Sequence, residues 1–197
     1  MSISSQKLVL FCGPSGSGKT TIVHHLLKKF PELTFSVSAT TREKRASEIN
    51  GVDYHFLSVD EFKRKMHRHE FLEWEEVYKN RYYGTLRSEV KRVFEEGKVV
   101  LFDVDVEGGL NIRSQYPKQI LDVFVMPPTV DDLHKRLIGR ASESDDSLAK
   151  RVSKAEKELE YAHRFNNVLV NDKLDVALKE AEVLVDTFLY GDVPDEI

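Results

Sequence analysis

Hydrophobic and polar positions along the chain fall into two kinds of segment that alternate. Short continuous apolar runs, such as Val99–Val104, are typical of strands that are covered on both faces. Helical patterns lie between them. This alternation predicts an α/β fold with a parallel sheet and right-handed crossovers. The strands are expected at Lys7–Phe11, Thr34–Val37, Val99–Val104, Ile120–Val125 and Val168–Val170, and the helices near Thr20–Phe30, Glu89–Glu96, Glu107–Ser114, Val130–Ile138, Leu148–His163 and Leu174–Phe188.

Two segments interrupt the alternation. Residues 39–86 carry two short aromatic-rich strand candidates, Tyr54–Leu57 and Phe71–Trp74, around one helical pattern at Val59–His69. This arrangement predicts an inserted, partly antiparallel subdomain, whose aromatic residues, Trp74 included, are expected to pack together. The segment Gly139–Asp146 is small and polar and lies between two helical patterns, which is typical of a mobile flap.

Composition narrows the class of protein. A chain of 197 residues with 41% hydrophobic and 31% charged residues fits one ordinary globular domain. The formal net charge of -4 argues against nucleic-acid binding driven by overall charge. No stretch approaches the roughly 18 apolar residues that a membrane span requires. The first seven residues lack a signal-peptide core, so a cytoplasmic location is expected.

The single cysteine, Cys12, rules out an internal disulfide. Because Cys12 ends the first apolar run, we expect a buried structural thiol rather than a nucleophile.

A glycine-rich stretch directly after the apolar run Leu8–Phe11 carries the first chemical signal. It fits the pattern G-x-x-x-x-G-K-[ST] of a phosphate-binding loop. Glycines let the backbone curl so that its N–H groups point at phosphate oxygens, and the following helix presents its positive dipole end. Lys19 is expected to reach the β- and γ-phosphates of ATP, and the Thr20 hydroxyl to bind Mg²⁺. The ATP-binding residues of this loop are Gly13, Pro14, Ser15, Gly16, Ser17, Gly18, Lys19 and Thr20.

A phosphate-binding loop indicates a nucleotide but not a reaction. More specific residues lie between positions 38 and 105, where Arg42 and Arg45 offer planar guanidinium groups that match phosphate oxygens. Given their order along the chain, the protein resembles the guanylate kinases from about Lys7 to Phe188. The residues that carry the resemblance are Ser38, Arg42, Arg45, Tyr54, Glu73, Tyr83, Thr85 and Asp105.

The resemblance implies a P-loop NTPase-type parallel-sheet core with an inserted GMP-binding subdomain and a helical lid. It also implies Mg²⁺-dependent transfer of the γ-phosphoryl group of ATP to GMP or dGMP, a step of purine nucleotide recycling. The implied partners are these small molecules, without nucleic acid or membrane. The implied segments are a core of residues 7–37, 87–138 and 163–189, a GMP-binding subdomain of 38–86, a lid of about 139–162 and a tail of 190–197.

In guanylate kinases the residue at the position of Glu73 accepts the two neighbouring N–H donors of guanine, which adenine does not offer. The hydroxyls of Ser38 and Thr85 are then expected near the guanine O6 edge. By the same resemblance, Arg42 and Arg45 hold the GMP phosphate together with tyrosine hydroxyls, and Asp105 is the aspartate of the GMP site. The phosphate-binding tyrosines are taken to be Tyr54 and Tyr83, counting back from Gly84, with Tyr82 as the alternative to Tyr83.

The remaining expected residues surround the transferring phosphoryl group. Arg136 and Arg140 lie four residues apart and share a helix face. With Arg151 and Lys19, they are implied by the resemblance to be the catalytic cations. Asn171 and Asp172 resemble the segment that touches the adenine of ATP. Asp103, at the end of a strand, is a further candidate for holding Mg²⁺ through its water shell.

Two other functions stay open at this point. Some guanylate-kinase-like modules bind protein ligands and lack a working phosphate-binding loop, whereas this loop is complete. A phosphate-loop kinase for another phosphorylated acceptor is the second alternative, and the guanine set of Ser38, Glu73 and Thr85 argues against it.

Overall fold

The computed structural model describes residues 6–138 and 145–191 of the chain. A five-stranded, fully parallel sheet forms its centre, with the strand order β2-β7-β1-β8-β9. The predicted parallel sheet is therefore confirmed, although the strand expected at Thr34–Val37 begins and ends earlier. The strands are β1 (Leu8–Cys12), β2 (Leu33–Phe35), β7 (Val99–Asp103), β8 (Ile120–Met126) and β9 (Asn167–Val170).

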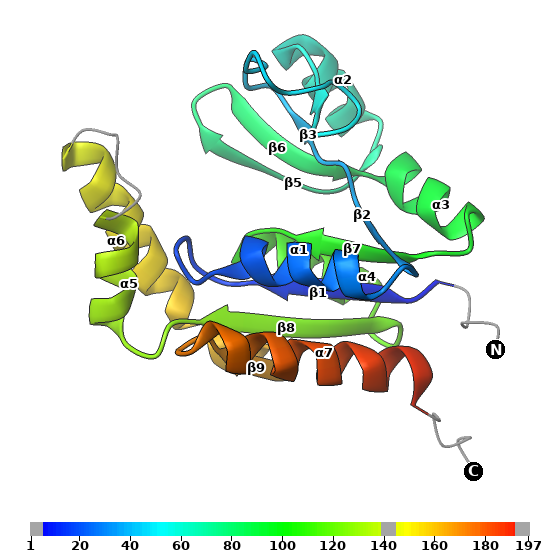
Figure 1. Ribbon diagram of the computed structural model, residues 1–197. Coiled ribbons are helices and arrows are strands. Elements are labelled where there is room, and N and C mark those ends of the chain that lie inside the picture. The colour runs from blue at the N-terminus through cyan, green and yellow to red at the C-terminus, as the bar shows by residue number, and fades with distance from the viewer. Residues whose placement is uncertain (1–5, 139–144, 192–197) are drawn as a thin grey trace.

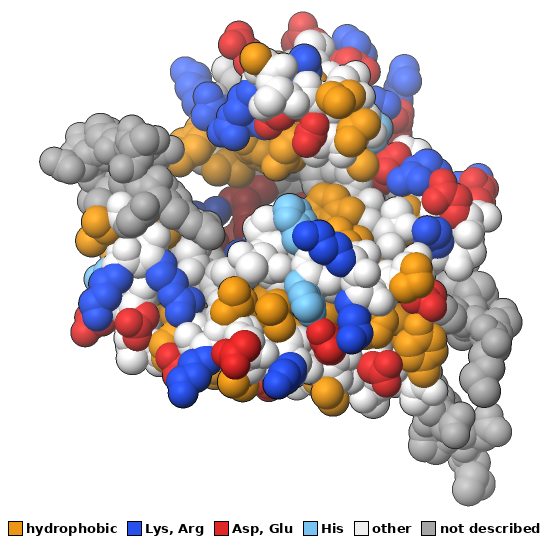
Figure 2. Space-filling model, in the orientation of Figure 1, with side chains coloured by type: hydrophobic (Ala, Val, Ile, Leu, Met, Phe, Trp, Pro, Cys, Tyr) orange, Lys and Arg blue, Asp and Glu red, His pale blue; other side chains and the backbone are white. Residues whose placement is uncertain are grey.

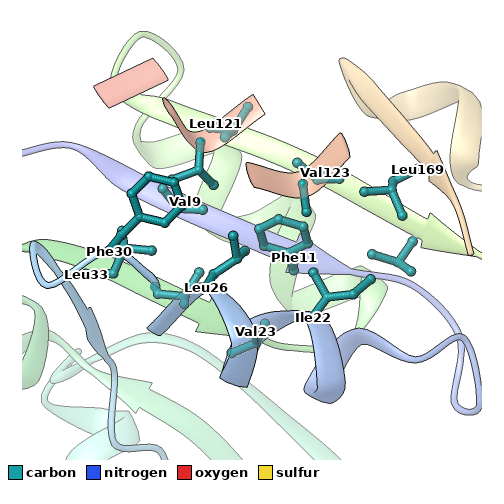
Figure 3. Packing of buried hydrophobic residues seen from close by; sticks show 14 of the residues in the cluster. Val9, Phe11, Ile22, Val23, Leu26, Phe30, Leu33, Leu121, Val123 and Leu169 are labelled. Atoms are coloured by element: carbon teal, nitrogen blue, oxygen red, sulfur yellow. The ribbon is translucent and has the colours of Figure 1, made fainter. Parts of the chain in front are cut away.

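Helices cover both faces of this sheet (Figure 1). Side chains of β1 alternate between two hydrophobic clusters, so that Val9 and Phe11 pack on one face while Leu8, Leu10 and Cys12 pack on the other. Figure 3 shows the first cluster, where β1 lies against α1. Burial on both faces explains why the strands read as continuous apolar runs. The covering helices are α1 (Lys19–Lys29) and α7 (Leu174–Tyr190) on one face, and α3 (Arg87–Glu95) and α4 (Val106–Gln115) on the other.

A second, smaller sheet lies above the first in Figure 1 and has the order β4-β3-β6-β5. Strands β5 and β6 form an antiparallel hairpin whose turn places Asn80 at a φ of 60°. The predicted partly antiparallel insertion is confirmed. The elements of this small lobe are β3 (Ala39–Thr40), β4 (His55–Phe56), α2 (Val59–His67), β5 (Phe71–Tyr78) and β6 (Arg81–Leu86).

Stacked aromatic rings join α2 to the small sheet. The ring of Phe62 lies 4.2 Å from that of Phe71 and 5.3 Å from that of Tyr82, measured between centroids. Trp74 contacts the ring of Tyr82 in this lobe, with 6.4 Å between centroids, but it lies at the surface of the lobe and the residue is 46% exposed. Successive residues of a strand point to opposite faces, and Trp74 follows the inward-facing Glu73.

Two further helices, α5 (Val130–Ile138) and α6 (Asp145–Leu159), pack against each other through Leu133, Leu137 and Ala155. The helix expected at Leu148–His163 starts earlier and stops at Leu159, and a separate 3-10 turn, η1 (Ala162–Arg164), follows. Most of the expected flap, residues 139–144, lies outside the described residues. Within the part of the chain that the structure describes, no helix is both long and apolar enough to cross a membrane.

Candidate nucleotide-binding site

A cavity of about 480 Å³ lies where the loop after β1, the small sheet and α6 meet. Figure 2 shows it as a recess below the small lobe, with acidic side chains in its depth. Its walls come from distant parts of the sequence, at the carboxyl ends of parallel strands, where α/β proteins bind their ligands. The predicted site residues that line it are Gly13, Ser15, Lys19, Ser38, Tyr54, Glu73, Tyr83, Asp103 and Asp105.

The glycine-rich loop between β1 and α1 curls as the sequence pattern predicts. Gly13, Gly16 and Gly18 have φ values of 136°, 87° and 97°, a region that favours glycine. Lys19 Nζ donates to the carbonyl oxygens of Gly13, at 2.6 Å, and Pro14, at 3.1 Å. The ammonium group therefore lies over the loop, where it can meet a phosphate.

Asn171, at the end of β9, supports this loop from below. Its buried side-chain amide donates to the carbonyl oxygen of Ser17 at 2.8 Å. A Cβ atom on Gly18 would lie 2.2 Å from the same amide nitrogen, so the close approach requires glycine. The amide of Asn171, a residue expected near the adenine of ATP, is therefore engaged in holding the phosphate-binding loop.

The two residues expected near Mg²⁺ lie side by side. The Thr20 hydroxyl donates to Asp103 Oδ2 at 2.8 Å. A hydroxyl and a carboxylate next to a phosphate-binding loop supply the oxygen ligands that Mg²⁺ prefers. The residues present therefore fit this ion.

Glu73 is buried in β5 and faces the cavity. Its burial raises the pKa of the carboxyl group to about 7. The partner strand places Thr85 beside it, close enough to oppose part of this rise. Yet the buried Thr85 hydroxyl makes no hydrogen bond of ordinary geometry within residues 6–138 and 145–191. A buried hydroxyl without a partner is uncommon. Thr85 lies beside Glu73 but does not itself line the cavity, so Glu73 is the member of this pair that faces a ligand there.

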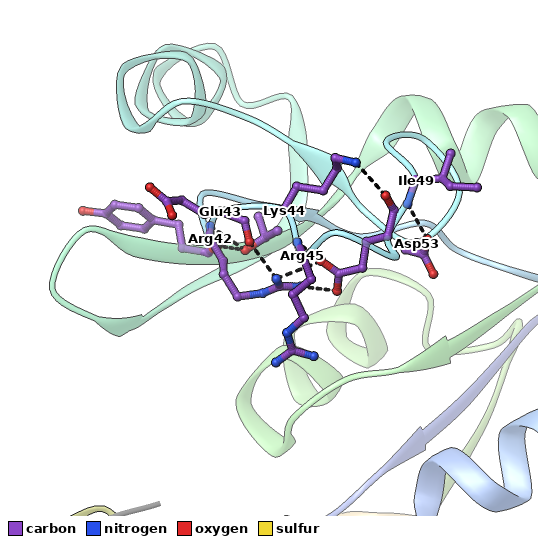
Figure 4. A network of polar contacts seen from close by, with 9 residues as sticks. Arg42, Glu43, Lys44, Arg45, Ile49 and Asp53 are labelled. Carbon is purple, nitrogen blue, oxygen red and sulfur yellow. Dashed lines mark hydrogen bonds and ion pairs between the residues drawn. The ribbon is translucent and has the colours of Figure 1, made fainter. Parts of the chain in front are cut away.

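Arg42 is held in a network that the sequence analysis did not predict (Figure 4). Its guanidinium donates two hydrogen bonds to Glu48, at 2.9 and 2.6 Å, and lies over the rings of Tyr54 and Phe56. The backbone N–H of Arg45 donates to Glu48 as well, at 2.7 Å. The hydrogen bonds from Arg42 and Arg45 lower the pKa of Glu48 to about 2. Glu48 stands in an ordinary polar loop, and only its opposite charge could have pointed to it.

The two neighbouring tyrosines of β6 point to opposite faces. Tyr82 is buried against α2, whereas Tyr83 lines the cavity and meets Tyr54 edge-on, with 6.1 Å between centroids. Tyr83 is therefore the tyrosine that can reach a ligand in the cavity.

Other predicted residues lie beside the cavity or outside the description. Arg136 donates to the backbone oxygen of Asn171 at 2.8 Å, next to the loop, and Asp172 is exposed. Arg140 lies outside the described residues, as does the side chain of Arg151. The cavity is also lined by charged residues that the sequence analysis missed, namely Glu75, Lys154 and Glu158. The period of two along a strand could have placed Glu75 on the face of Glu73.

Comparisons with known proteins identify the family to which the chain is similar. A sequence model of the family described as guanylate kinase matches residues 5–187. A guanylate kinase of Bacteroides fragilis is 45% identical over 183 residues, which is 93% of this chain and 90% of that protein. A guanylate kinase of Salinibacter ruber is 46% identical over 93% of this chain and 97% of its own length.

Among solved structures, guanylate kinase from Anaplasma phagocytophilum superposes with a TM-score of 0.75 at 22% identity, covering 96% of this chain and 90% of that one. At 22% sequence identity, this structural similarity supports the fold alone. The family model matches most of the chain, and the two bacterial relatives are 45% and 46% identical to it. The protein therefore belongs to the guanylate kinase family.

Proposed function

We propose that the protein transfers the γ-phosphoryl group of ATP to GMP or dGMP, yielding ADP and GDP or dGDP. The observation that carries this proposal is a single cavity with the phosphate-binding loop on one side and the buried Glu73 on the other. In this proposal residues 38–86 bind GMP, residues of about 139–162 form a lid, and residues 7–37, 87–138 and 163–189 form the core that binds ATP.

Recognition of guanine is assigned to Glu73. Guanine presents N1–H and N2–H₂ side by side, and a carboxylate can accept both hydrogen bonds at once. Adenine offers no such pair, so it would leave the buried carboxylate without partners, which excludes it strongly. The hydroxyls of Ser38 and Thr85 complete the guanine site, and Asp105 closes it from the N-terminus of α4, where it caps the N–H of Gly108 at 2.9 Å.

The phosphate of GMP is assigned to Arg42, Arg45, Tyr54 and Tyr83. Charge-assisted hydrogen bonds from guanidinium groups are among the strongest that a phosphate can receive. Arg42 is already oriented by Glu48, so little of its side-chain entropy remains to be lost on binding.

The transfer itself needs no protein nucleophile. An oxygen of the GMP phosphate attacks the γ-phosphorus in line, and the bond from that phosphorus to the oxygen of ADP breaks. Lys19 leaves the carbonyl oxygens of Gly13 and Pro14 to meet the phosphates, and Arg136, Arg140 and Arg151 add charge around the transferring group. Thr20 and Asp103 would hold Mg²⁺, which neutralises phosphate charge when it is bound.

A coupled assay of ADP production tests the proposal. Purified protein is given ATP and Mg²⁺ with GMP, dGMP, AMP, CMP, UMP or ribose phosphates in parallel. We expect turnover with GMP and dGMP only, and its loss in Lys19→Ala with an unchanged melting temperature. Equal turnover with AMP or with a sugar phosphate would favour the alternative kinase, and no turnover with any acceptor would favour a protein-binding module. Action in the cytoplasm and in purine recycling stays a prediction.

A further inference from the structure

Lys154 lies where three parts of the molecule meet. Its ammonium group, on α6, is 3.1 Å from Glu75 Oε1, 3.6 Å from Asp105 Oδ2 and 3.8 Å from Glu158 Oε1. Glu75 belongs to β5 of the small sheet, Asp105 caps α4 of the core, and Glu158 stands one turn further along α6. All four side chains line the cavity.

The ammonium group of Lys154 therefore forms ion pairs with three carboxylates. Burial by itself would lower the pKa of Lys154, but the surrounding carboxylates outweigh it and raise that pKa. The carboxyl of Glu75 is hydrogen-bonded to that of Asp105, and this contact, with partial burial, raises the pKa of Glu75 to about 7. Lys154 favours the ionised form of both Glu75 and Asp105, and so opposes their repulsion across the boundary between β5 and α4.

The residues that Lys154 contacts on β5 and at the start of α4 are neighbours of the expected guanine acceptor, Glu73. Glu75 follows Glu73 on the same face of β5, two residues along. Gly108 of α4 lies against the Glu73 carboxylate, because a Cβ on Gly108 would come within 2.9 Å of Glu73 Oε2. Beyond the effect of burial, the charge of Asp105, at the N-cap of α4, is near enough to raise the pKa of Glu73. A change in the position of β5 relative to α4 would therefore move the proposed guanine acceptor.

The same helix also touches the opposite wall. The carboxylate of Glu158, one turn after Lys154, accepts the backbone N–H of Ser15 in the phosphate-binding loop. Lys154 is thus the part of α6 that faces the guanine side of the cavity, while Glu158 faces the phosphate side.

We propose that Lys154 is a positioning residue that ties the proposed lid helix α6 to the GMP-binding subdomain through Glu75 and to the core through Asp105, and thereby sets the affinity for GMP. The inference rests on the proposed function, because it takes the wall of Glu73, Glu75 and Asp105 to be the guanine side. In this inference Lys154 does not touch the reacting atoms and acts only through Glu75 and Asp105.

The first test replaces Lys154 with methionine, which keeps the length of the side chain and removes the charge. We expect the KM for GMP, and the Kd for GMP measured by calorimetry, to rise about five- to tenfold, while the KM for ATP changes less than about twofold. Lys154→Arg keeps a cation in place and should stay within about twofold of the unmodified protein. Lys157→Met, at an exposed lysine of the same helix, is the matched control and should change neither constant.

The second test asks whether Lys154 acts through Glu75. If it does, the double variant Glu75→Gln/Lys154→Met should bind GMP no more weakly than the weaker of the two single variants. Effects that multiply would overturn the inference, as would equal weakening of ATP and GMP in Lys154→Met. If that variant fails to fold, Glu75→Gln alone tests the pair from the side of β5, and its KM for GMP should rise while that for ATP does not.

The two proposals fail separately. An unmodified protein that phosphorylates GMP, with Lys154→Met behaving as Lys157→Met does, overturns the inference and leaves the proposed function standing. An unmodified protein that turns over no GMP overturns the proposed function.

Discussion

The Glu73 carboxyl is buried, and this burial raises its pKa from an ordinary value of 4.5 to about 7. Between those two pH values the folded protein binds more protons at this residue than the unfolded chain does. The contribution of Glu73 to the free energy of unfolding therefore falls as the pH rises from about 4.5 to 7. In the free protein the ionised side chain is a cost to stability, which the guanine donors of a bound nucleotide would offset.

Glu73→Gln should for this reason separate stability from function. At pH 8 we expect its melting temperature to exceed that of the unmodified protein by roughly 3 °C or more, since about 1 kcal/mol shifts a domain of this size by about 2–4 °C. At pH 5 the difference should shrink. The kcat/KM for GMP should fall at least about tenfold, which corresponds to roughly 1.4 kcal/mol. Calorimetric scans at both pH values and steady-state kinetics measure these changes, and equal melting temperatures at pH 8 would contradict the argument.

Glu48 illustrates a residue that acts on the site through its neighbour. Both it and Arg42 are largely buried, with 13% and 14% of their side chains exposed. Glu48→Gln keeps the shape but leaves one oxygen to accept where two accepted before, so Arg42 should become mobile. We expect the KM for GMP to rise about tenfold, the KM for ATP to stay within about twofold, and kcat to change less than the KM for GMP. Glu43→Gln, at an exposed glutamate of the same loop, is the control and should change neither KM value nor kcat.

At the scale of elements, the segments with one clear periodicity could be predicted, whereas β3 and β6 could not. Helices such as α7 and the buried strands of the parallel sheet carry many residues with one periodicity, so their patterns are clear. Strand β3 has two residues, and its place is decided by pairing with β6 rather than by its own sequence. Strand β6 was missed because it combines outward and inward tyrosines with Gly84, a mixture that favours no single structure.

The first turn of helix α4 contains a glycine, Gly108, at the point where the helix approaches the carboxylate of Glu73. Alanine there would ordinarily stabilise a helix by up to about 1 kcal/mol. A Cβ at this position would lie 2.9 Å from Glu73 Oε2 and 3.2 Å from Asp105 Oδ1. Gly108→Ala should therefore displace the two carboxylates and weaken GMP binding at least about tenfold, with ATP binding unchanged. Calorimetric titration with each nucleotide measures this, and unchanged GMP affinity would show that the two side chains can move aside freely.

For the whole molecule, the sequence motif was sufficient for one half of the site and insufficient for the other. The residues of the phosphate-binding loop are contiguous, so their geometry is local and follows from glycine positions. The opposite wall is assembled from β5, the N-terminus of α4 and α6, which are brought together only by the packing of the fold. Glu73 and Asp105 could be named there through a family resemblance, but Glu75, Lys154 and Glu158 have no motif of their own and became visible only in three dimensions.

This division of the cavity predicts reciprocal behaviour of two variants. Lys19 stands on the phosphate-loop wall and Glu73 on the opposite wall, so each should affect one nucleotide more than the other. A nucleotide at about 100 times its Kd stabilises the folded protein by about 2.7 kcal/mol, which should raise the melting temperature by roughly 5–10 °C. Glu73→Gln should lose most of the rise caused by GMP and keep that caused by ATP with Mg²⁺, while Lys19→Ala should show the converse. Thermal melts of both variants with each nucleotide provide the measurement. If either variant lost both rises, the two walls would not be separate binding sites, because a single change would then have damaged the cavity as a whole.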